Sequence, residues 1–200
     1  MPPEPVGIRF DATAHRYWSG PRELLSVTRV LREAGLVDAT WYTEAARERG
    51  AALHALTEAI DRDEPIAEAM DPASLHALDP YLEAYRTFLA EAHPVWTGIE
   101  TPAADLALGY AGTLDRWGTL QGDAVVVDLK TGTVPPWAPL QLVAYARLAL
   151  DGHAVRRRRI VVQLLPTGRY SVREFPVVNF GRDERIFLSA LAIAQWKRAA

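Results

Sequence analysis

Residues 112–132 read GTLDRWGTLQGDAVVVDLKTG, and this stretch decides the fold. Its apolar and β-branched residues indicate two strands joined by a turn near Gly118–Gly122. Asp115 lies in the first strand, and Asp128 and Lys130 interrupt the otherwise apolar second strand. Because side chains alternate along a strand, Asp128 and Lys130 project from the same face. We therefore expect two adjacent strands that bring the carboxylates of Asp115 and Asp128 together.

This pair of acids predicts a metal centre. Two ionised carboxylates in close contact repel each other, and a divalent cation relieves that repulsion. The chain has no cysteine, which excludes thiolate ligands and a cysteine-held iron–sulfur cluster, so hard oxygen ligands favour Mg²⁺ or Mn²⁺. One or two such ions would activate water and a phosphoryl oxygen, while Lys130 would orient the water and stabilise the developing charge. The alternative is structural: Asp-x-Lys alone is a weak signal and also fits an ion pair at the rim of the sheet.

A histidine upstream adds to the pattern. Gly50, His54 and Glu58 are spaced four residues apart in RGAALHALTEAI, so they share one face of a predicted helix. A histidine that faces the sheet could bind the metal through one ring nitrogen, with the other nitrogen held by an acceptor. The alternative for His54 is a packed or surface histidine.

Polar groups also follow the second strand. Thr131 and Gly132 come directly after Lys130, and a glycine there allows the backbone to approach a phosphate closely. Gln141 and Tyr145 are one helical turn apart in the next segment, so one helix face would present an amide and a phenol towards the sheet. The alternative is that Tyr145 belongs to the core and Gln141 caps the helix or contacts solvent.

The remainder of the chain reads as one α/β domain over residues 1–200, because no repeat, low-complexity segment or linker divides it. We expect N-terminal strands and helices over 1–93, a catalytic sheet core over 94–178 and a C-terminal helix over 179–200. Within these parts, periodicity and turn residues predict strands over 7–11, 15–18, 95–101, 108–120, 124–131, 156–165 and 170–178, and helices over 26–36, 41–61, 73–92, 138–150 and 182–199.

The composition is that of a soluble globular protein, with 49% apolar and 24% charged residues. No apolar run is long enough to cross a membrane and the N-terminal residues lack the basic start and apolar run of a signal peptide, so we expect a cytoplasmic protein of a bacterial or phage-infected cell. The net charge of −3 hides an uneven distribution, since acids dominate residues 44–91 and bases dominate residues 156–200. Arg156 and Arg158 share one strand face and could bind phosphates; protection of a strand edge is the alternative.

Four ordered motifs resemble the PD-(D/E)XK nuclease superfamily, in particular its RecB-like and phage-type exonuclease branch. They are GxxxH at Gly50–His54, GTLD at Gly112–Asp115, DxK with its following TG at Asp128–Gly132, and QxxxY at Gln141–Tyr145. The opening FDATAHRYW…LLSVTRVL is also similar to the start of phage-type members. The resemblance implies a restriction-endonuclease-like core, with a central mixed sheet flanked by helices and an N-terminal helical extension.

The resemblance also implies roles for individual residues. Metal ligands would be His54, Asp115, Asp128 and the backbone carbonyl of Leu129, and Lys130 would be the catalytic lysine. Gln141 and Tyr145 would support that lysine and contact DNA. Glu100, in the strand before GTLD, resembles an acidic position found in some members.

The expected function is a metal-dependent exonuclease that hydrolyses DNA from linear ends, in recombination, repair or phage DNA processing. The expected partners are single- or double-stranded DNA and a recombination or replication protein. Three alternatives stay open: an endonuclease of the same superfamily, a catalytically silent DNA-binding member, and a metal-dependent phosphatase or nucleotide hydrolase with a small substrate. QxxxY and the basic C-terminal third favour a nuclease over the last of these.

Overall fold

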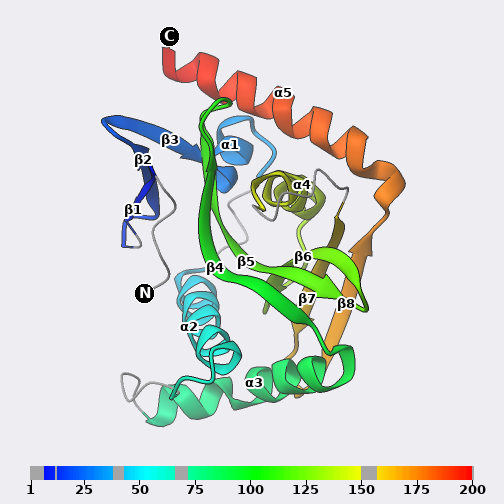
Figure 1. Cartoon of the computed structure of the whole chain (residues 1–200). Coiled ribbons are helices and arrows are strands. Elements are labelled where there is room, and N and C mark those ends of the chain that lie inside the picture. The colour runs from blue at the N-terminus through cyan, green and yellow to red at the C-terminus, as the bar shows by residue number, and fades with distance from the viewer. Residues whose placement is uncertain (1–6, 12, 38–42, 66–71, 150–156, 200) are drawn as a thin grey trace.

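A computed structural model of the protein describes residues 7–11, 13–37, 43–65, 72–149 and 157–199, with the side chains of 72–74 left aside. Within these residues the chain forms three strands, then three helices and three further strands, followed by a helix, two strands, a 3₁₀ helix and a last helix (Figure 1). The elements are β1 (Arg9–Asp11), β2 (Arg16–Ser19), β3 (Arg22–Ser26), α1 (Val27–Glu33), α2 (Glu44–Asp61), α3 (Pro72–Ala92), β4 (Val95–Asp105), β5 (Tyr110–Leu120), β6 (Asp123–Lys130), α4 (Ala138–Leu148), β7 (Arg158–Leu164), β8 (Tyr170–Phe175), the 3₁₀ helix η2 (Val177–Asn179) and α5 (Phe180–Ala199).

The strands form one mixed sheet in the order β1-β2-β3-β5-β6-β7-β8, with β4 paired to β5. β5 is antiparallel to β4 and β6, whereas β3 and β5, and β6 and β7, are parallel. Helix α4 connects the parallel strands β6 and β7, as such a crossover requires. The mixed sheet flanked by helices confirms the predicted fold class.

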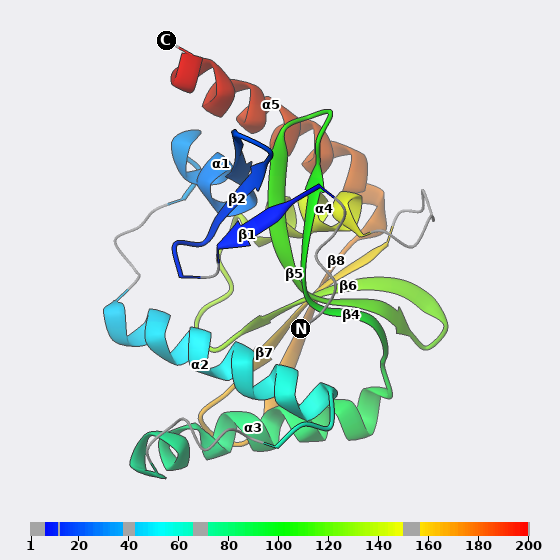
Figure 2. The same ribbon diagram turned by 60° about the vertical axis from the view of Figure 1, so that its left-hand side comes forward.

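Helices cover both faces of the sheet, and the core is divided accordingly. Helices α1, α4 and α5 pack on one face, where Val126 and Val161 belong to the buried cluster. Helix α3 packs on the other face against Val125 and Val127, and α2 packs on α3 (Figures 1 and 2). The alternation of Val125, Val126 and Val127 between the two clusters shows that β6 is buried on both faces, which explains its continuous apolar sequence.

One edge of β5 is shared by two strands, and this positions the candidate site. β4 pairs with β5 along nearly its whole length. On the other edge, β3 pairs at Tyr110 and Ala111, and β6 pairs only from Arg116 onwards. Among the described residues, the stretch 112–115 therefore has no strand neighbour on that edge. The GTLD motif lies in the fork where β3 and β6 diverge.

Helix ends follow ordinary capping chemistry. Ser26 is the N-cap of α1, and its hydroxyl accepts a hydrogen bond from the Arg29 amide at 3.2 Å. Gly35 follows the helix in the left-handed region, at φ 78°, where glycine carries no steric penalty. Thr43 caps α2, which begins at Glu44; the earlier start expected near residue 41 lies outside the described residues.

Three details of the sequence prediction are wrong. The segment Arg22–Ser26 is a strand, β3, that pairs with both β2 and β5, although its short charged sequence gave no strand signal. β4 continues to Asp105 instead of ending near residue 101. β8 ends at Phe175 because Pro176 has no amide hydrogen to donate, and η2 and α5 follow where a strand was expected to residue 178. No helix within the described ranges is both long and apolar enough to cross a membrane.

Candidate functional site

The carboxylates of Asp115 and Asp128 lie at the fork between β5 and β6. The antiparallel ladder pairs Arg116 with Val127 and stops there, one residue short of both aspartates. Beyond it, the amide of Leu129 donates to Asp115 Oδ2 at 2.8 Å, so a side-chain carboxylate replaces the backbone acceptor of the next rung. Both aspartates are buried. The sequence prediction that the two strands are adjacent is therefore correct, and the end of the ladder leaves room beside them.

Lys130 lies on the same face of β6 as Asp128, and its Nζ contacts Asp128 Oδ1 at 2.9 Å. The other carboxylate oxygen, Asp128 Oδ2, is buried and has no hydrogen-bond partner among the described residues. An unsatisfied buried carboxylate oxygen costs free energy, and a cation is the kind of partner that removes the cost. The ion pair between Asp128 and Lys130, which was the alternative to a metal site, thus exists, but it provides a partner for only one of the two Asp128 carboxylate oxygens.

His54 brings α2 to the same place. Its Nδ1 lies 2.9 Å from Glu100 Oε1 and 3.7 Å from Asp115 Oδ2. His54, Glu100 and Asp115 each offer a ligand atom, and these atoms lie within 4.8 Å of one another. Asp128 stands beside this group and is not part of it. Of the expected metal ligands, the structure therefore brings His54 and Asp115 together and adds Glu100.

Glu100 has an unusual backbone. It lies in the middle of β4 with φ 42°, in the left-handed region that a glutamate rarely adopts, and it has no partner in the ladder between Ile99 and Thr101. Such a conformation costs on the order of 1–3 kcal/mol and persists only where the surroundings impose it. The kink turns the Glu100 carboxylate towards His54.

A buried arginine lies behind Glu100, and the sequence analysis did not single it out. The Arg116 guanidinium is fully buried and donates to Glu100 Oε1 at 2.9 Å and to Thr57 Oγ1 at 3.1 Å. Its Nε pairs with Asp61 at the end of α2, and Tyr85 on α3 donates to the same Asp61 oxygen. The only sequence signal was an arginine directly after the GTLD aspartate, where alternation would direct it into the core.

Two opposing effects, burial and the charges of neighbouring groups, determine the pKa values in this cluster. Burial raises the pKa of Asp128, Lys130 lowers it and Asp115 raises it again, with a net value of about 6. Burial lowers the pKa of His54, but the carboxylates of Asp115 and Glu100 outweigh it and raise the pKa to about 9. Without a cation, a protonated His54 is thus stabilised where the carboxylates gather. The cluster favours positive charge, and that is the property a metal site needs.

Gln141 and Tyr145 form the floor of the fork from α4. Both are buried, and Gln141 Nε2 donates to the Tyr145 hydroxyl at 3.1 Å. The Tyr145 ring lies against Gly112: a Cβ at that glycine would lie 2.7 Å from Tyr145 Cε1. The small residue of GTLD and the tyrosine of QxxxY are therefore complementary shapes. Burial raises the pKa of Tyr145 well above its ordinary value, with a further contribution from Asp115, so the hydroxyl stays protonated.

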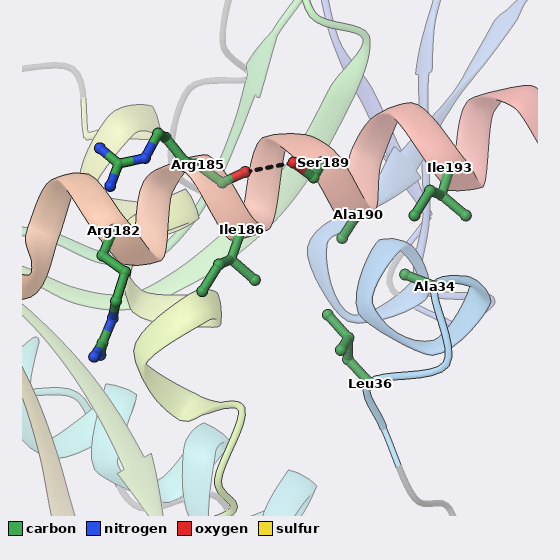
Figure 3. A pocket seen from close by; sticks show the side chains of 8 residues that line it. All are labelled: Ala34, Leu36, Arg182, Arg185, Ile186, Ser189, Ala190 and Ile193. Atoms are coloured by element: carbon green, nitrogen blue, oxygen red, sulfur yellow. Dashed lines mark hydrogen bonds between the residues drawn. The ribbon is translucent and has the colours of Figure 1, made fainter.

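A cleft of about 810 Å³ opens beside these residues, between α2 and the segment from Leu129 to Trp137. Thr131 and Gly132 line it next to Lys130, and Gly50 and His54 line it from the helix. A volume of this size is within the range of binding clefts. A second hollow lies between α1 and α5, where Leu36, Ile186 and Ile193 line it together with Arg182 and Arg185 (Figure 3); none of the predicted site residues is there.

The basic strand predicted to bind phosphates does not reach the cleft. Arg158 lies at the start of β7, in register with Val125, whereas Gln163 is the residue in register with Lys130. The Arg158 guanidinium pairs with Glu174 on β8. Arg156 lies outside the described residues. Arg157 and Arg159 are fully buried, with their guanidinium groups over the rings of Trp117 and Phe180.

Comparison with known proteins identifies the family. A family model described as the PD-(D/E)XK nuclease superfamily matches residues 2–187. The chain belongs to this superfamily. No curated protein matches it. Members of the superfamily are nucleases that use divalent metals, and the His54–Glu100–Asp115 group with the unsatisfied Asp128 oxygen fits such an ion.

Three solved structures are similar over most of their length, at low identity. The alkaline exonuclease LHK-Exo from Laribacter hongkongensis is 14% identical, with 88% of this chain and 92% of that chain covered and a TM-score of 0.35. LHK-Exo in complex with dAMP is also 14% identical, covering 87% and 89% with a TM-score of 0.36. SSO0001 is 13% identical, covering 82% and 83% with a TM-score of 0.31. Likenesses this weak do not extend the assignment beyond the superfamily.

Proposed function

We propose that this PD-(D/E)XK nuclease is a Mg²⁺- or Mn²⁺-dependent deoxyribonuclease that hydrolyses phosphodiester bonds from DNA ends. The activity would be carried by one nuclease domain spanning residues 1–200, of the RecB-like or phage exonuclease type, acting in recombination, repair or phage DNA processing. DNA is the proposed substrate, and a recombination or replication protein is the proposed partner.

One observation carries the proposal: two buried carboxylates and a lysine converge at the edge of a cleft, and one of the carboxylate oxygens has no hydrogen-bond partner within the described part of the chain. Asp115 and Asp128 come from neighbouring strands, Lys130 contacts Asp128, and Asp128 Oδ2 is unsatisfied. A protein that needed only stability would gain by replacing such a group with apolar residues. The arrangement therefore supports a metal-binding catalytic role over a structural one.

We assign metal binding to His54, Asp115, Asp128 and the carbonyl of Leu129. A bound divalent cation would supply polarisation of a phosphoryl oxygen and a water of lowered pKa. Lys130 is held by Asp128 at 2.9 Å, and from there it orients the attacking water and places positive charge near the phosphate. The amides of Thr131 and Gly132, on the same wall of the cleft, bind the substrate backbone.

Gln141 and Tyr145 act from the opposite side of the fork. Their mutual hydrogen bond and the packing of Tyr145 on Gly112 fix the α4 face against β5. In the proposed role they keep the catalytic strand in place and contact DNA near the cleft floor. Arg158 is left out of the proposed interface, because its guanidinium is engaged with Glu174.

The test uses the two lysines of the chain, Lys130 and Lys197. End-labelled linear DNA and covalently closed circular DNA are incubated with wild type, Lys130→Ala and Lys197→Ala, with Mg²⁺ and with EDTA. Lys197 lies on α5 and donates to the Glu33 carbonyl, so its loss should leave activity unchanged. Lys130→Ala should slow cleavage about 10²–10³-fold, as expected for loss of one preorganised electrostatic group.

The outcomes separate the levels of the proposal. Cleavage in EDTA, or equal cleavage by wild type and Lys130→Ala, would overturn the metal-dependent mechanism. Cleavage of closed circles as readily as linear DNA would leave a nuclease but replace the exonuclease by an endonuclease. Binding of DNA without any cleavage by the wild type would favour the catalytically silent alternative.

A further inference from the structure

The buried guanidinium of Arg116 has no role in the mechanism proposed above. Arg116 follows Asp115 on β5, and successive side chains of a strand leave opposite faces. The Asp115 carboxylate faces the Leu129 amide in the fork, while Arg116 enters the layer under α2 and α3, next to Asp61 and Tyr85. A fully buried arginine is costly unless its charge is paired and its five N–H groups find acceptors. Its partners therefore indicate what it does.

On the helix side, the guanidinium is anchored from two helices. Nε pairs with Asp61 at the end of α2, and Nη2 donates to the Thr57 hydroxyl one turn earlier at 3.1 Å. Asp61 is itself fixed by Tyr85 of α3, whose hydroxyl donates to it at 2.6 Å. Thr57 is fixed as well, because its hydroxyl donates to the carbonyls of Leu53 and His54. The contacts with α2 and α3 thus fix the position of the Arg116 guanidinium.

On the sheet side, Arg116 meets Glu100. Nη1 donates to Glu100 Oε1 at 2.9 Å, and the same oxygen lies 2.9 Å from His54 Nδ1. Both contacts use Oε1, so Oε2 remains available as a ligand. The left-handed backbone of Glu100, at φ 42°, needs such a partner to persist.

We infer that Arg116 is a positioning residue that holds Glu100 in place as a further metal ligand beside His54 and Asp115. The inference rests on the proposed function and deepens it, because it adds Glu100 to the ligand set and gives Arg116 a role through Glu100. A purely structural role, in which Arg116 only ties α2 to β5, would affect stability and leave metal affinity unchanged.

The experiment is a double-mutant cycle read by metal binding. Mn²⁺ alone is titrated calorimetrically into wild type, Arg116→Lys, Glu100→Gln and the double variant, without DNA. Each single substitution should raise the Mn²⁺ Kd about 10–100-fold, the size seen when groups that orient metal ligands are lost. Because Arg116 acts through Glu100, the double variant should bind no more than about twofold more weakly than Glu100→Gln, as coupled residues are non-additive.

A matched control separates positioning from folding. Arg159 is another fully buried arginine that pairs with a buried aspartate, Asp183, and it is not among the residues that line the cleft. Arg159→Lys should lower the melting temperature as Arg116→Lys does and leave the Mn²⁺ Kd unchanged. If Arg116→Lys does not fold, Asp61→Asn replaces it in the cycle, since it weakens the anchor of the guanidinium and should still raise the Kd severalfold.

Three results would overturn the inference: Mn²⁺ binding by Glu100→Gln that equals wild type, additive losses in the cycle, or an equal loss in Arg159→Lys. None of these touches the proposed function, which is decided by Lys130→Ala on DNA. Conversely, a wild type that binds Mn²⁺ through Glu100 but cuts no DNA would uphold the metal site and refute the nuclease activity.

Discussion

The substitution Gly112→Ala tests whether the GTLD and QxxxY motifs are complementary shapes. The added Cβ would lie 2.7 Å from Tyr145 Cε1 and 3.3 Å from both Tyr145 Cδ1 and Val27 Cγ2. Carbon atoms pack at roughly 3.5–4.0 Å, so the closest contact is almost an ångström too short. The Tyr145 ring is buried and its hydroxyl accepts from Gln141, so it cannot turn away without losing that bond.

The expected loss of stability is about 1–3 kcal/mol, the usual cost of an extra methyl group in a packed core. Gly112 does not occupy the left-handed region, so the loss comes from the clash alone. For a domain of this size each kcal/mol lowers the melting temperature by roughly 2–4 °C. Displacement of Tyr145 should also slow DNA cleavage, because the ring supports the strand that carries Asp115.

Urea unfolding of wild type, Gly112→Ala and Gly50→Ala measures the effect. Gly50 lies within α2, and a Cβ there meets nothing within 4 Å, so alanine should stabilise the protein by about 0.5–1 kcal/mol. The two substitutions should therefore have opposite signs in one assay. A Gly112→Ala protein as stable as wild type would refute the packing argument.

A second-site change sharpens the test. Tyr145→Phe keeps the ring that the new methyl group meets, so it should not relieve Gly112→Ala. Tyr145→Ala removes the ring, and the double variant should lose less stability than the sum of the two single losses. Additive losses for Tyr145→Ala would show that Gly112 and Tyr145 do not constrain each other.

Three further predictions concern stability, pH and substrate binding. Asp183→Ala leaves the fully buried guanidinium of Arg159 without its carboxylate partner and should lower the free energy of unfolding in urea by about 3–5 kcal/mol. A loss below about 1 kcal/mol would show that water reaches the arginine. The pKa of Asp128 is raised to about 6 in the fold, so its contribution to stability is favourable below about pH 4 and is lost as the pH rises through about 6. Asp128→Asn should accordingly raise the melting temperature of the EDTA-treated protein at pH 8 and not at pH 4, and the same gain at both pH values would contradict this. Arg49 lines the cleft, and its buried Nε has no hydrogen-bond partner among the residues that the structure describes, so we expect it to bind a phosphate of the DNA. Arg49→Ala should therefore raise KM for DNA and reduce the slope of log KM against log salt concentration by about 0.7–1. The control Arg86→Ala, at an exposed position of α3, should change neither when KM is measured at several salt concentrations.

Local patterns in the sequence were enough to predict most of the elements. The continuous apolar run of β6 identified a strand because the burial of a strand shows in consecutive residues of the chain. The strand Arg22–Ser26 was missed because its pairing with β5 depends on residues some 85 positions away. Propensity contains no information on a contact of that kind.

The candidate site divides in the same way. Asp115, Asp128 and Lys130 could be found from sequence, because polar residues that interrupt apolar strands at alternating positions are visible in one chain. The tertiary structure decided that Asp128 Oδ2 is unsatisfied, that Glu100 adopts a left-handed backbone towards His54, and that Arg158 is engaged elsewhere. Arg116 became significant only through its partners on α2 and α3. Charge, burial and hydrogen bonding are properties of groups brought together from distant positions, and only the folded chain determines which groups meet.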